Sequence, residues 1–314
     1  MDNDPKLNLI FLVGALRSGT TVLRLMLDHH PEISNPGEYD FFFDEVSDDG
    51  IVPDADVFME WLETERVYQY SGLSYDPELD YVSNLKSFFK VLSKNKTNVV
   101  INIHRNFHKI PMLFPEARFI HLLRDPRDVA RSSIGMGWSG NVYYGVDHWI
   151  GSENSWGRFA SDLDNDKYTE VTFESLIDKT DETLQELCDF IGVPFSKKMY
   201  DYQNNSTYSA PDKTLIWQWK RKLSPQEIIQ VESKAGGLMI NRGYQPVNEG
   251  EITLGFLTKA RLYIQNKLVR WKFSMARVGI WLFFVEKITR KLGLNKLNSK
   301  YRKKIQTIQQ ALVK

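Results

Sequence analysis

The first apolar run of the chain, Leu9–Val13, is short and uninterrupted and ends at Gly14. Such a run is typical of a strand in a parallel sheet that is covered on both faces. Apolar residues then recur at helical spacing from Val22 to Leu27. Residues 9–30 therefore predict a buried strand that turns through a glycine-containing loop directly into a helix.

The same pattern of strand, turn and helix returns about a hundred residues later. The apolar pattern of residues 118–123 predicts a central parallel strand, which ends before Asp125-Pro126. Proline suits the first turn of a new helix and Asp125 suits its cap. Because ligands of open α/β sheets collect at the carboxyl ends of strands, Arg124 and the helix hydroxyl of Ser132 are candidates to bind a phosphate. The alternative is a surface Arg-Asp network.

A third amphipathic segment covers residues 181–191. Leu184, Leu187, Cys188 and Ile191 fall on one helical face, and Gly192 marks the end of the helix.

The first helix start has the composition of an anion site. Free backbone N–H groups open the helix, whose dipole favours negative charge. Further donors come from one guanidinium, one glycine amide and three hydroxyl groups, in Arg17, Gly19, Ser18, Thr20 and Thr21. The pattern predicts a bound phosphate or sulfate group, although a tight turn with solvated polar groups remains the alternative.

The spacing from Gly14 to Gly19-Thr20-Thr21 resembles a nucleotide phosphate-binding loop with one large difference. Thr20 stands where an NTPase has its lysine, and that loss argues against ATP or GTP chemistry. The cation is Arg17 instead. A planar guanidinium can bind two oxygens at once, which suits the bridging oxygen between a phosphate and a sulfate.

Together, Arg-Ser-Gly-Thr-Thr at 17–21 and Arg-Asp-Pro-Arg-Asp-Val-Ala-Arg-Ser at 124–132 resemble the sulfotransferase superfamily. The resemblance covers roughly residues 8–245. It implies an α/β fold with a P-loop-like central parallel sheet flanked by helices, and no metal. It also implies that 3′-phosphoadenosine 5′-phosphosulfate (PAPS) is the co-substrate and PAP the product. In this family the first motif holds the 5′-phosphosulfate, and the second holds the 3′-phosphate through residues matching Arg124 and Ser132.

The chain looks most like the bacterial and tyrosylprotein-type members, in which a Gly-Glu pair follows the first helix. Here that pair is Gly37-Glu38. The resemblance implies that Glu38 is the general base, and the chemistry agrees, because an attacking hydroxyl must lose its proton to a nearby group. Asp40 is the alternative base if the loop has a different register. A solvated loop carboxylate is the non-catalytic interpretation of Glu38.

Three departures from the family pattern matter. The family's transition-state lysine has no counterpart in residues 102–106, so His104 or Arg105 must replace it, if anything does. Arg105 is the better electrostatic candidate because it is always charged. His104 is charged only where its site favours the imidazolium. Phe173 stands where the family often has the tyrosine of a Tyr-Glu-x-Leu strand end; it retains a face for adenine or for core packing but lacks the hydroxyl. Residues 204–220 resemble the segment that closes over PAPS in this family. The family's lysine there is Gln218 in this chain, so its charge would have to come from Lys213 or Lys220.

Length and composition fit a cytoplasmic enzyme. The chain has 314 residues and one cysteine, Cys188, which is most simply a small core residue. Its first residues show no secretory signal, and no run of eighteen apolar residues occurs.

The net charge of zero hides an asymmetry. Residues 251–314 hold fifteen Lys and Arg and two Glu, so the tail carries +13 and residues 1–250 carry −13. We therefore expect a sulfotransferase domain at 1–250 and a basic amphipathic helical extension at 251–314. The mixture of basic and aromatic residues suits an anionic membrane surface at the cytoplasmic face, although docking on the acidic main domain or on a partner is also open. No nucleic-acid partner is expected, because the tail is too apolar.

Residues 44–80 are acidic, with twelve Asp and Glu and one basic residue, Arg66. They form either two solvated helices or an acidic entrance for a cationic acceptor. The sequence as a whole predicts an enzyme that transfers a sulfuryl group from PAPS to a hydroxyl of a carbohydrate, a lipid-linked or small molecule, or a peptide tyrosine. The alternatives are a P-loop phosphoryl-transfer enzyme and a non-catalytic PAP-binding protein.

Overall fold

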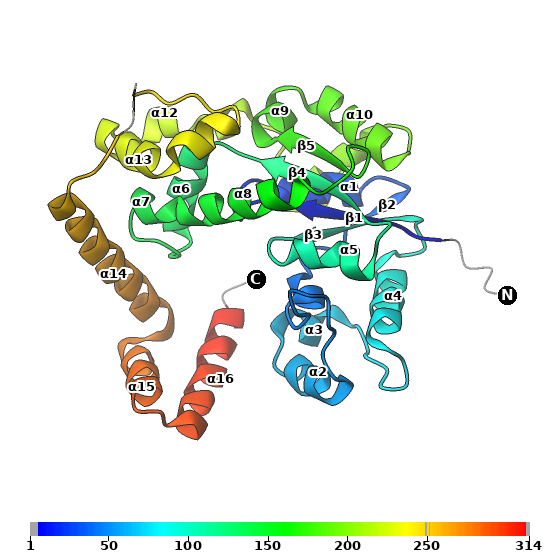
Figure 1. Ribbon diagram of the computed structural model, residues 1–314, viewed down its shortest axis with the longest axis horizontal. Coiled ribbons are helices and arrows are strands. Elements are labelled where there is room, and N and C mark those ends of the chain that lie inside the picture. The colour runs from blue at the N-terminus through cyan, green and yellow to red at the C-terminus, as the bar shows by residue number, and fades with distance from the viewer. Residues whose placement is uncertain (1–5, 249, 251, 312–314) are drawn as a thin grey trace. The chain divides into compact units, whose positions relative to one another are not determined.

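The computed structural model describes residues 6–248, 250 and 252–311. Five parallel strands form one sheet in the order β2-β3-β1-β4-β5 (Figure 1). The strands are β1 (Asn8–Val13), β2 (Ile33–Ser34), β3 (Asn98–Ile103), β4 (Arg118–Leu123) and β5 (Tyr168–Thr172). β1 is central and pairs with β3 on one side and β4 on the other. The burial of Ile10–Val13 explains the uninterrupted apolar run in the sequence.

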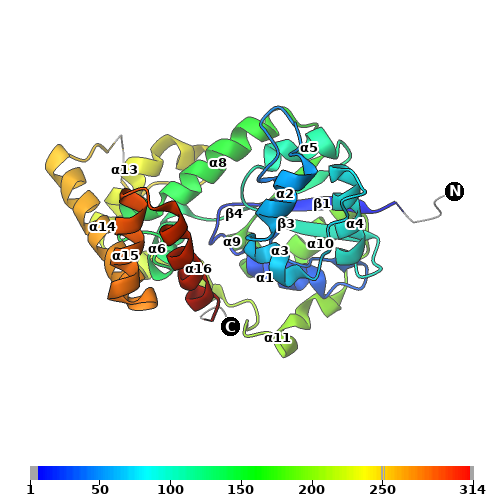
Figure 2. The same ribbon diagram turned by 90° about the horizontal axis from the view of Figure 1, so that it is seen from below.

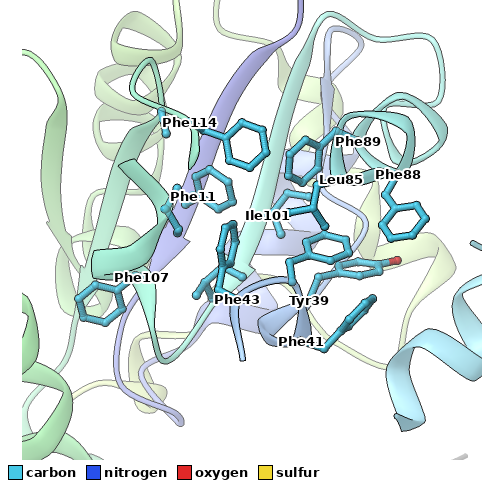
Figure 3. Packing of buried hydrophobic residues seen from close by; sticks show 14 of the residues in the cluster. Phe11, Tyr39, Phe41, Phe43, Leu85, Phe88, Phe89, Ile101, Phe107 and Phe114 are labelled. Carbon is cyan, nitrogen blue, oxygen red and sulfur yellow. The ribbon is translucent and has the colours of Figure 1, made fainter. Parts of the chain in front are cut away.

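Alternate residues of β1 enter two different cores because successive side chains of a strand point to opposite faces. Ile10 and Leu12 pack among residues of the α1 side, with Leu23. Phe11 lies on the other face in an aromatic cluster, where its ring meets the Phe43 ring edge-on at 5.8 Å between centroids (Figure 3). The sheet is therefore covered on both faces, as a parallel sheet requires.

Two compact units can be distinguished. The first comprises the residues up to Val129 together with His148–Lys222, and it contains the whole sheet. Its helical elements are α1 (Thr20–Asp28), η1 (Asp40–Phe43), α2 (Ala55–Leu62), α3 (Arg66–Ser71), α4 (Tyr81–Leu92), η2 (Phe107–Lys109), α5 (Ile110–Leu113), α8 (Asp147–Ala160), α9 (Phe173–Asp178), α10 (Thr180–Ile191), η3 (Lys197–Tyr200), α11 (Tyr202–Asn205), η4 (Lys213–Leu215) and α12 (Trp219–Lys222).

The second unit comprises Ala130–Asp147 and Leu223–Lys314. α6 (Pro126–Gly135) leads into it, and it contains α7 (Val142–Gly145), α13 (Pro225–Asn241), α14 (Phe256–Val278), α15 (Ile280–Lys291) and α16 (Asn295–Ala311). The last three pack side by side (Figure 2). None of the helices in the described ranges has the length and apolar character that a membrane span needs.

Within this unit α14 is docked on the loop after α6. The Asn266 side chain accepts a hydrogen bond from the Gly140 N–H at 2.7 Å, and the Asn141 side chain donates to the Leu262 carbonyl at 2.8 Å. A Cβ on Gly137 would lie 2.1 Å from the Phe273 ring, so this contact leaves no room for a side chain. The predicted boundary after Gly250 falls inside this unit and stays a prediction about domain organisation.

The sheet and the helical character of the tail are confirmed. The predicted strand 118–123 is β4, and the helix that follows it begins at Pro126. The helix predicted over 181–191 is α10, which buries Leu184, Leu187, Cys188 and Ile191 and ends at Gly192 in the left-handed conformation.

Candidate functional site

The carboxyl edge of the sheet brings most of the predicted site residues to the first unit's P-loop-like turn. β1 leads into Gly14, β3 into His104, and β4 into Arg124. In parallel strands these ends lie at one edge, where open α/β sheets bind their ligands. This placement follows from topology, because the three strands are neighbours in the sheet but far apart in the chain.

The loop between β1 and α1 has the strained backbone of an anion site. Arg17 and Gly19 both have positive φ values, 76° and 98°. A Cβ on Gly19 would lie 2.2 Å from the Phe173 ring, so only glycine fits here. α1 begins at Thr20 without a side-chain cap, and the buried Ser18 Oγ has no hydrogen-bond partner among the described residues. Orphaned donors at a helix N-terminus favour an anionic guest.

Glu38 is fixed at the same edge by the strand beside it. It forms an isolated parallel bridge with Asn102, the penultimate residue of β3. The Asn102 N–H donates to the Gly37 carbonyl at 3.0 Å, and the Tyr39 N–H donates to the Asn102 carbonyl at 3.2 Å. The backbone is thus held on both sides of Glu38, while its side chain is 49% exposed. The carboxylate is therefore both positioned and accessible.

His104 contacts this carboxylate. Its Nε2 lies 3.5 Å from Glu38 Oε1, and its Nδ1 lies 2.9 Å from the carbonyl oxygen of Gly14. The contact with His104 is the main reason why the pKa of Glu38 is lowered. Burial opposes protonation of His104, but its interactions with Glu38 and Asp40 outweigh burial and raise the His104 pKa. Each group thus favours the charged form of the other, carboxylate for Glu38 and imidazolium for His104.

Asp40 and Arg105 face a different set of partners. The Asp40 carboxylate accepts the backbone N–H groups of His104 and Arg105, at 2.6 and 3.2 Å, and so holds the end of β3. The Arg105 guanidinium is bidentate to Asp44, at 2.7 and 2.5 Å. Of the two candidates for the missing lysine, His104 is therefore the one that contacts both Glu38 and the loop.

Arg124 is a mostly buried cation at the end of β4. Its guanidinium lies over the Phe173 ring at 4.2 Å and donates to the carbonyls of Arg17 and Leu215 at 3.2 and 3.0 Å. Burial lowers its pKa, and its carboxylate contact, Asp128, lies at 3.8 Å. A second anion would compensate this buried charge. Ser132, the other predicted 3′-phosphate residue, lies on α6.

The Phe173 ring packs in a small apolar core and also lies under the Arg124 guanidinium. It is buried with Ile177 and Ile216. Ile216 belongs to the segment expected to close over PAPS, so this segment packs on α9. Its two candidate lysines are engaged differently: Lys213 pairs with Asp178 at 2.6 Å, and Lys220 lies over the rings of Trp217 and Trp219.

One residue beside Glu38, Arg24, escaped the sequence analysis. Asp28, on the same side of α1, accepts the Asn35 N–H at 2.9 Å. Arg24 lies four residues before Asp28, one turn back along the same side of α1. The Arg24 charge also contributes, after that of His104, to the low pKa of Glu38. The i, i+4 pair of Arg24 and Asp28 was the available signal.

The acidic segment is largely a surface element with an aromatic underside. α2 buries Phe58 and Leu62, and Tyr68 of α3 meets Phe41, three residues after Glu38, edge-on at 6.0 Å between ring centroids. Its carboxylates include Asp44, which is used by Arg105.

The Glu38–His104 pair predicts a pH dependence of any reaction that uses it. Because the His104 pKa is raised, the imidazolium persists above its ordinary value of 6.5 and is lost as the pH rises through the raised value. We expect the reaction rate to fall on this alkaline side, and His104→Gln to remove that limb of the profile. Rates measured from pH 5 to 10 test this. The control is His108→Gln, which alters a histidine that faces Asp48; an unchanged alkaline limb in His104→Gln would refute the assignment.

Comparison with known proteins finds one family. The model of the sulfotransferase family matches residues 9–197. An uncharacterized protein of Aquifex aeolicus (strain VF5) is 26% identical over 214 residues, which are 62% of this chain and 26% of that protein. The chain therefore spans about a quarter of the length of this curated relative.

Two solved structures are similar in fold. The sulfotransferase domain from the curacin biosynthetic pathway has a TM-score of 0.54 at 19% identity, covering 76% of this chain and 98% of that one. The sulfotransferase domain from the Synechococcus PCC 7002 olefin synthase has a TM-score of 0.52 at 18% identity, covering 78% and 98%. Both likenesses are those of the sheet and its helices.

Proposed function

The chain belongs to the sulfotransferase family, and from this premise we propose that it transfers a sulfuryl group from PAPS to a hydroxyl group of an acceptor. The observation that carries the proposal is the accessible Glu38 carboxylate, held by β3 and in contact with His104, beside an uncapped helix N-terminus. A base next to an anion site is what transfer to a hydroxyl requires.

The residues of the loop fit the phosphosulfate. The orphaned hydroxyl of Ser18 and the uncapped start of α1 supply donors, and Gly19 permits close approach of the backbone. Arg17, Thr20 and Thr21 add a guanidinium and two hydroxyls. Arg124 would bind the 3′-phosphate, and the assignments of Ser132 to that phosphate and of Lys220 to the closing segment remain sequence-based predictions.

PAPS supplies an activated sulfuryl group, whose sulfur gains a bond to the acceptor oxygen and loses its bond to the phosphate. Glu38 takes the proton of the acceptor hydroxyl, since its lowered pKa keeps it ionised. The imidazolium of His104 holds Glu38 in place and offers positive charge near the Gly14 carbonyl. Arg17 and the helix N-terminus favour the charge that develops on the leaving phosphate.

Transfer of label tests this function. Purified protein with ³⁵S-labelled PAPS and a cell extract should produce a labelled product whose label depends on Glu38. Tight binding of PAP with no transfer to any acceptor would instead support a non-catalytic PAP-binding protein. Dependence on magnesium and ATP would support phosphoryl transfer.

Recognition of the 3′-phosphate can be tested without an acceptor. We expect Arg124→Ala to weaken PAP binding while changing the binding of adenosine 5′-phosphosulfate little, because the second ligand lacks the 3′-phosphate. A lost charge-assisted contact costs about 1.5 to 3 kcal/mol, or roughly 10- to 150-fold in affinity. Calorimetry measures both ligands. Arg118→Ala, at the opposite end of β4 and stacked on Phe190, is the matched control. Unchanged discrimination in Arg124→Ala would contradict the assignment.

A further inference from the structure

Helices α14 and α15 of the second unit expose an unusual amount of apolar surface. On α15 the exposed apolar residues are Ile280, Trp281, Phe284 and Ile288. Their spacing of i, i+1, i+4 and i+8 puts them on one face of the helix. Trp281 is 74% exposed. A tryptophan exposed to this degree gains little from the core of its unit, and a cluster of such side chains marks an interaction surface.

α14 carries a second face of the same kind. Exposed apolar residues recur there at i, i+1, i+7, i+8 and i+12, namely Phe256, Leu257, Tyr263, Ile264 and Leu268. The face that docks on the loop after α6 uses Leu262 and Asn266 instead, both of which are buried. The packing of α14 against α15 uses Trp271 and Phe283, whose ring centroids are 5.9 Å apart. Apart from Tyr263, whose ring meets the Tyr144 ring of α7 edge-on at 6.4 Å, the exposed residues are therefore in addition to these packing contacts.

The charge of the same helices has one sign. Residues 256–291, which span α14 and α15, contain nine Lys and Arg and a single acidic residue, Glu286, which pairs with Arg290 at 3.7 Å. Lys287 and Lys291 lie seven and eleven residues after Ile280, which places them beside the apolar face of α15. Lys287 lies over the rings of Trp271 and Phe283 at 5.3 and 4.9 Å, so its alkyl chain covers aromatic surface.

We infer that the exposed faces of α14 and α15 bind the surface of an anionic lipid bilayer, which lies along these helices and is not crossed by them. Apolar surface alone would fit a protein partner or a second copy of the chain equally well. The surrounding cations favour the bilayer, because a second copy packed through the same two helices would bring a like charge, whereas anionic headgroups neutralise it. Tryptophan and phenylalanine at the level of the headgroups complete an interfacial site.

Co-sedimentation with vesicles tests the inference on the full chain. We expect binding to vesicles of phosphatidylcholine with phosphatidylglycerol, little binding to phosphatidylcholine alone, and loss of most binding in about 0.5 M salt because of screening. The double substitution Trp281→Ser with Phe284→Ser should weaken binding at least tenfold, since it removes the two large rings of the exposed face. Lys287→Glu with Lys291→Glu, beside the apolar face of α15, should weaken binding mainly at low salt.

A matched control is Ile51→Ser with Tyr70→Ser, which alters exposed apolar residues of the first unit and should leave vesicle binding unchanged. Equal thermal stability of the variants shows that the fold is retained. Three results would overturn the inference: no sedimentation with either vesicle, equal binding to neutral vesicles, or a stable dimer in light scattering that Trp281→Ser with Phe284→Ser dissociates. Sedimentation is read without any sulfuryl transfer, so its outcome is independent of the proposed reaction.

Discussion

Replacing Glu38 with Gln should leave PAP binding intact and slow sulfuryl transfer by a factor of about 10² to 10⁴, the usual effect of removing a general base. The side chains have nearly the same shape, and Glu38 is held by backbone bonds of Asn102 that the substitution does not touch. The capacity to accept the acceptor proton is lost, together with the negative charge that helps to raise the His104 pKa. Transfer of label from ³⁵S-labelled PAPS measures the rate, and calorimetry with PAP measures the binding.

Asp40→Asn is the matched comparison, because Asp40 was the alternative base. Its carboxylate accepts the N–H groups of His104 and Arg105, and burial raises its pKa. We expect this variant to act through the position of His104, with a smaller loss of rate that is accompanied by a lower melting temperature. If Asp40→Asn abolished transfer at full stability while Glu38→Gln stayed active, Asp40 would be the base.

Replacing His121 with Leu should lower the free energy of unfolding by about 3 to 5 kcal/mol, the usual cost of removing one partner from a buried ion pair. His121 is fully buried in β4, with Glu170 at 2.9 Å, Glu153 at 3.2 Å and the Trp156 ring stacked at 4.5 Å. Leucine fills the space of the imidazole but removes the cationic partner of Glu153 and Glu170. Urea unfolding measures the change.

The pH gives this prediction a second test. Burial opposes protonation of His121, but the charge of Glu153 and the contact with Glu170 outweigh burial, so the His121 pKa is raised. Its contribution is complete below the ordinary value of 6.5 and is lost as the pH rises through the value in the folded protein. The difference between wild type and His121→Leu should therefore shrink at alkaline pH.

His29→Leu serves as the control for His121. Its Nδ1 lies 2.8 Å from the carbonyl of Leu25, and losing that hydrogen bond should cost only about 1 kcal/mol. A loss in His121→Leu no larger than that of the control, or one that stays constant from pH 6 to pH 10, would show that the buried cluster holds no charged imidazole.

Local pattern was enough to predict the elements that surround the site. The run Leu9–Val13, the Gly14 and Gly19 turn and the Asp125-Pro126 start of α6 each depend on neighbours within a few residues. An unbroken run of apolar residues predicts a strand that is buried on both faces. Glycine and proline predict the backbone conformation of the turns in which they lie. The α/β class and the family resemblance could therefore be predicted from the chain alone.

Only the tertiary structure decided which of two adjacent candidates, His104 or Arg105, contacts Glu38. Sequence chemistry favoured Arg105 because it is always charged, yet Asp44 holds it, and His104 contacts Glu38. His104 and Arg105 are adjacent in the chain, but successive side chains leave a strand end in opposite directions. Arg24 shows the converse: it is fourteen residues from Glu38 in sequence and becomes its neighbour only because α1 packs back along the sheet. Local propensity carries no information about such contacts between distant segments, whose geometry is set by the packing of the helices on the sheet.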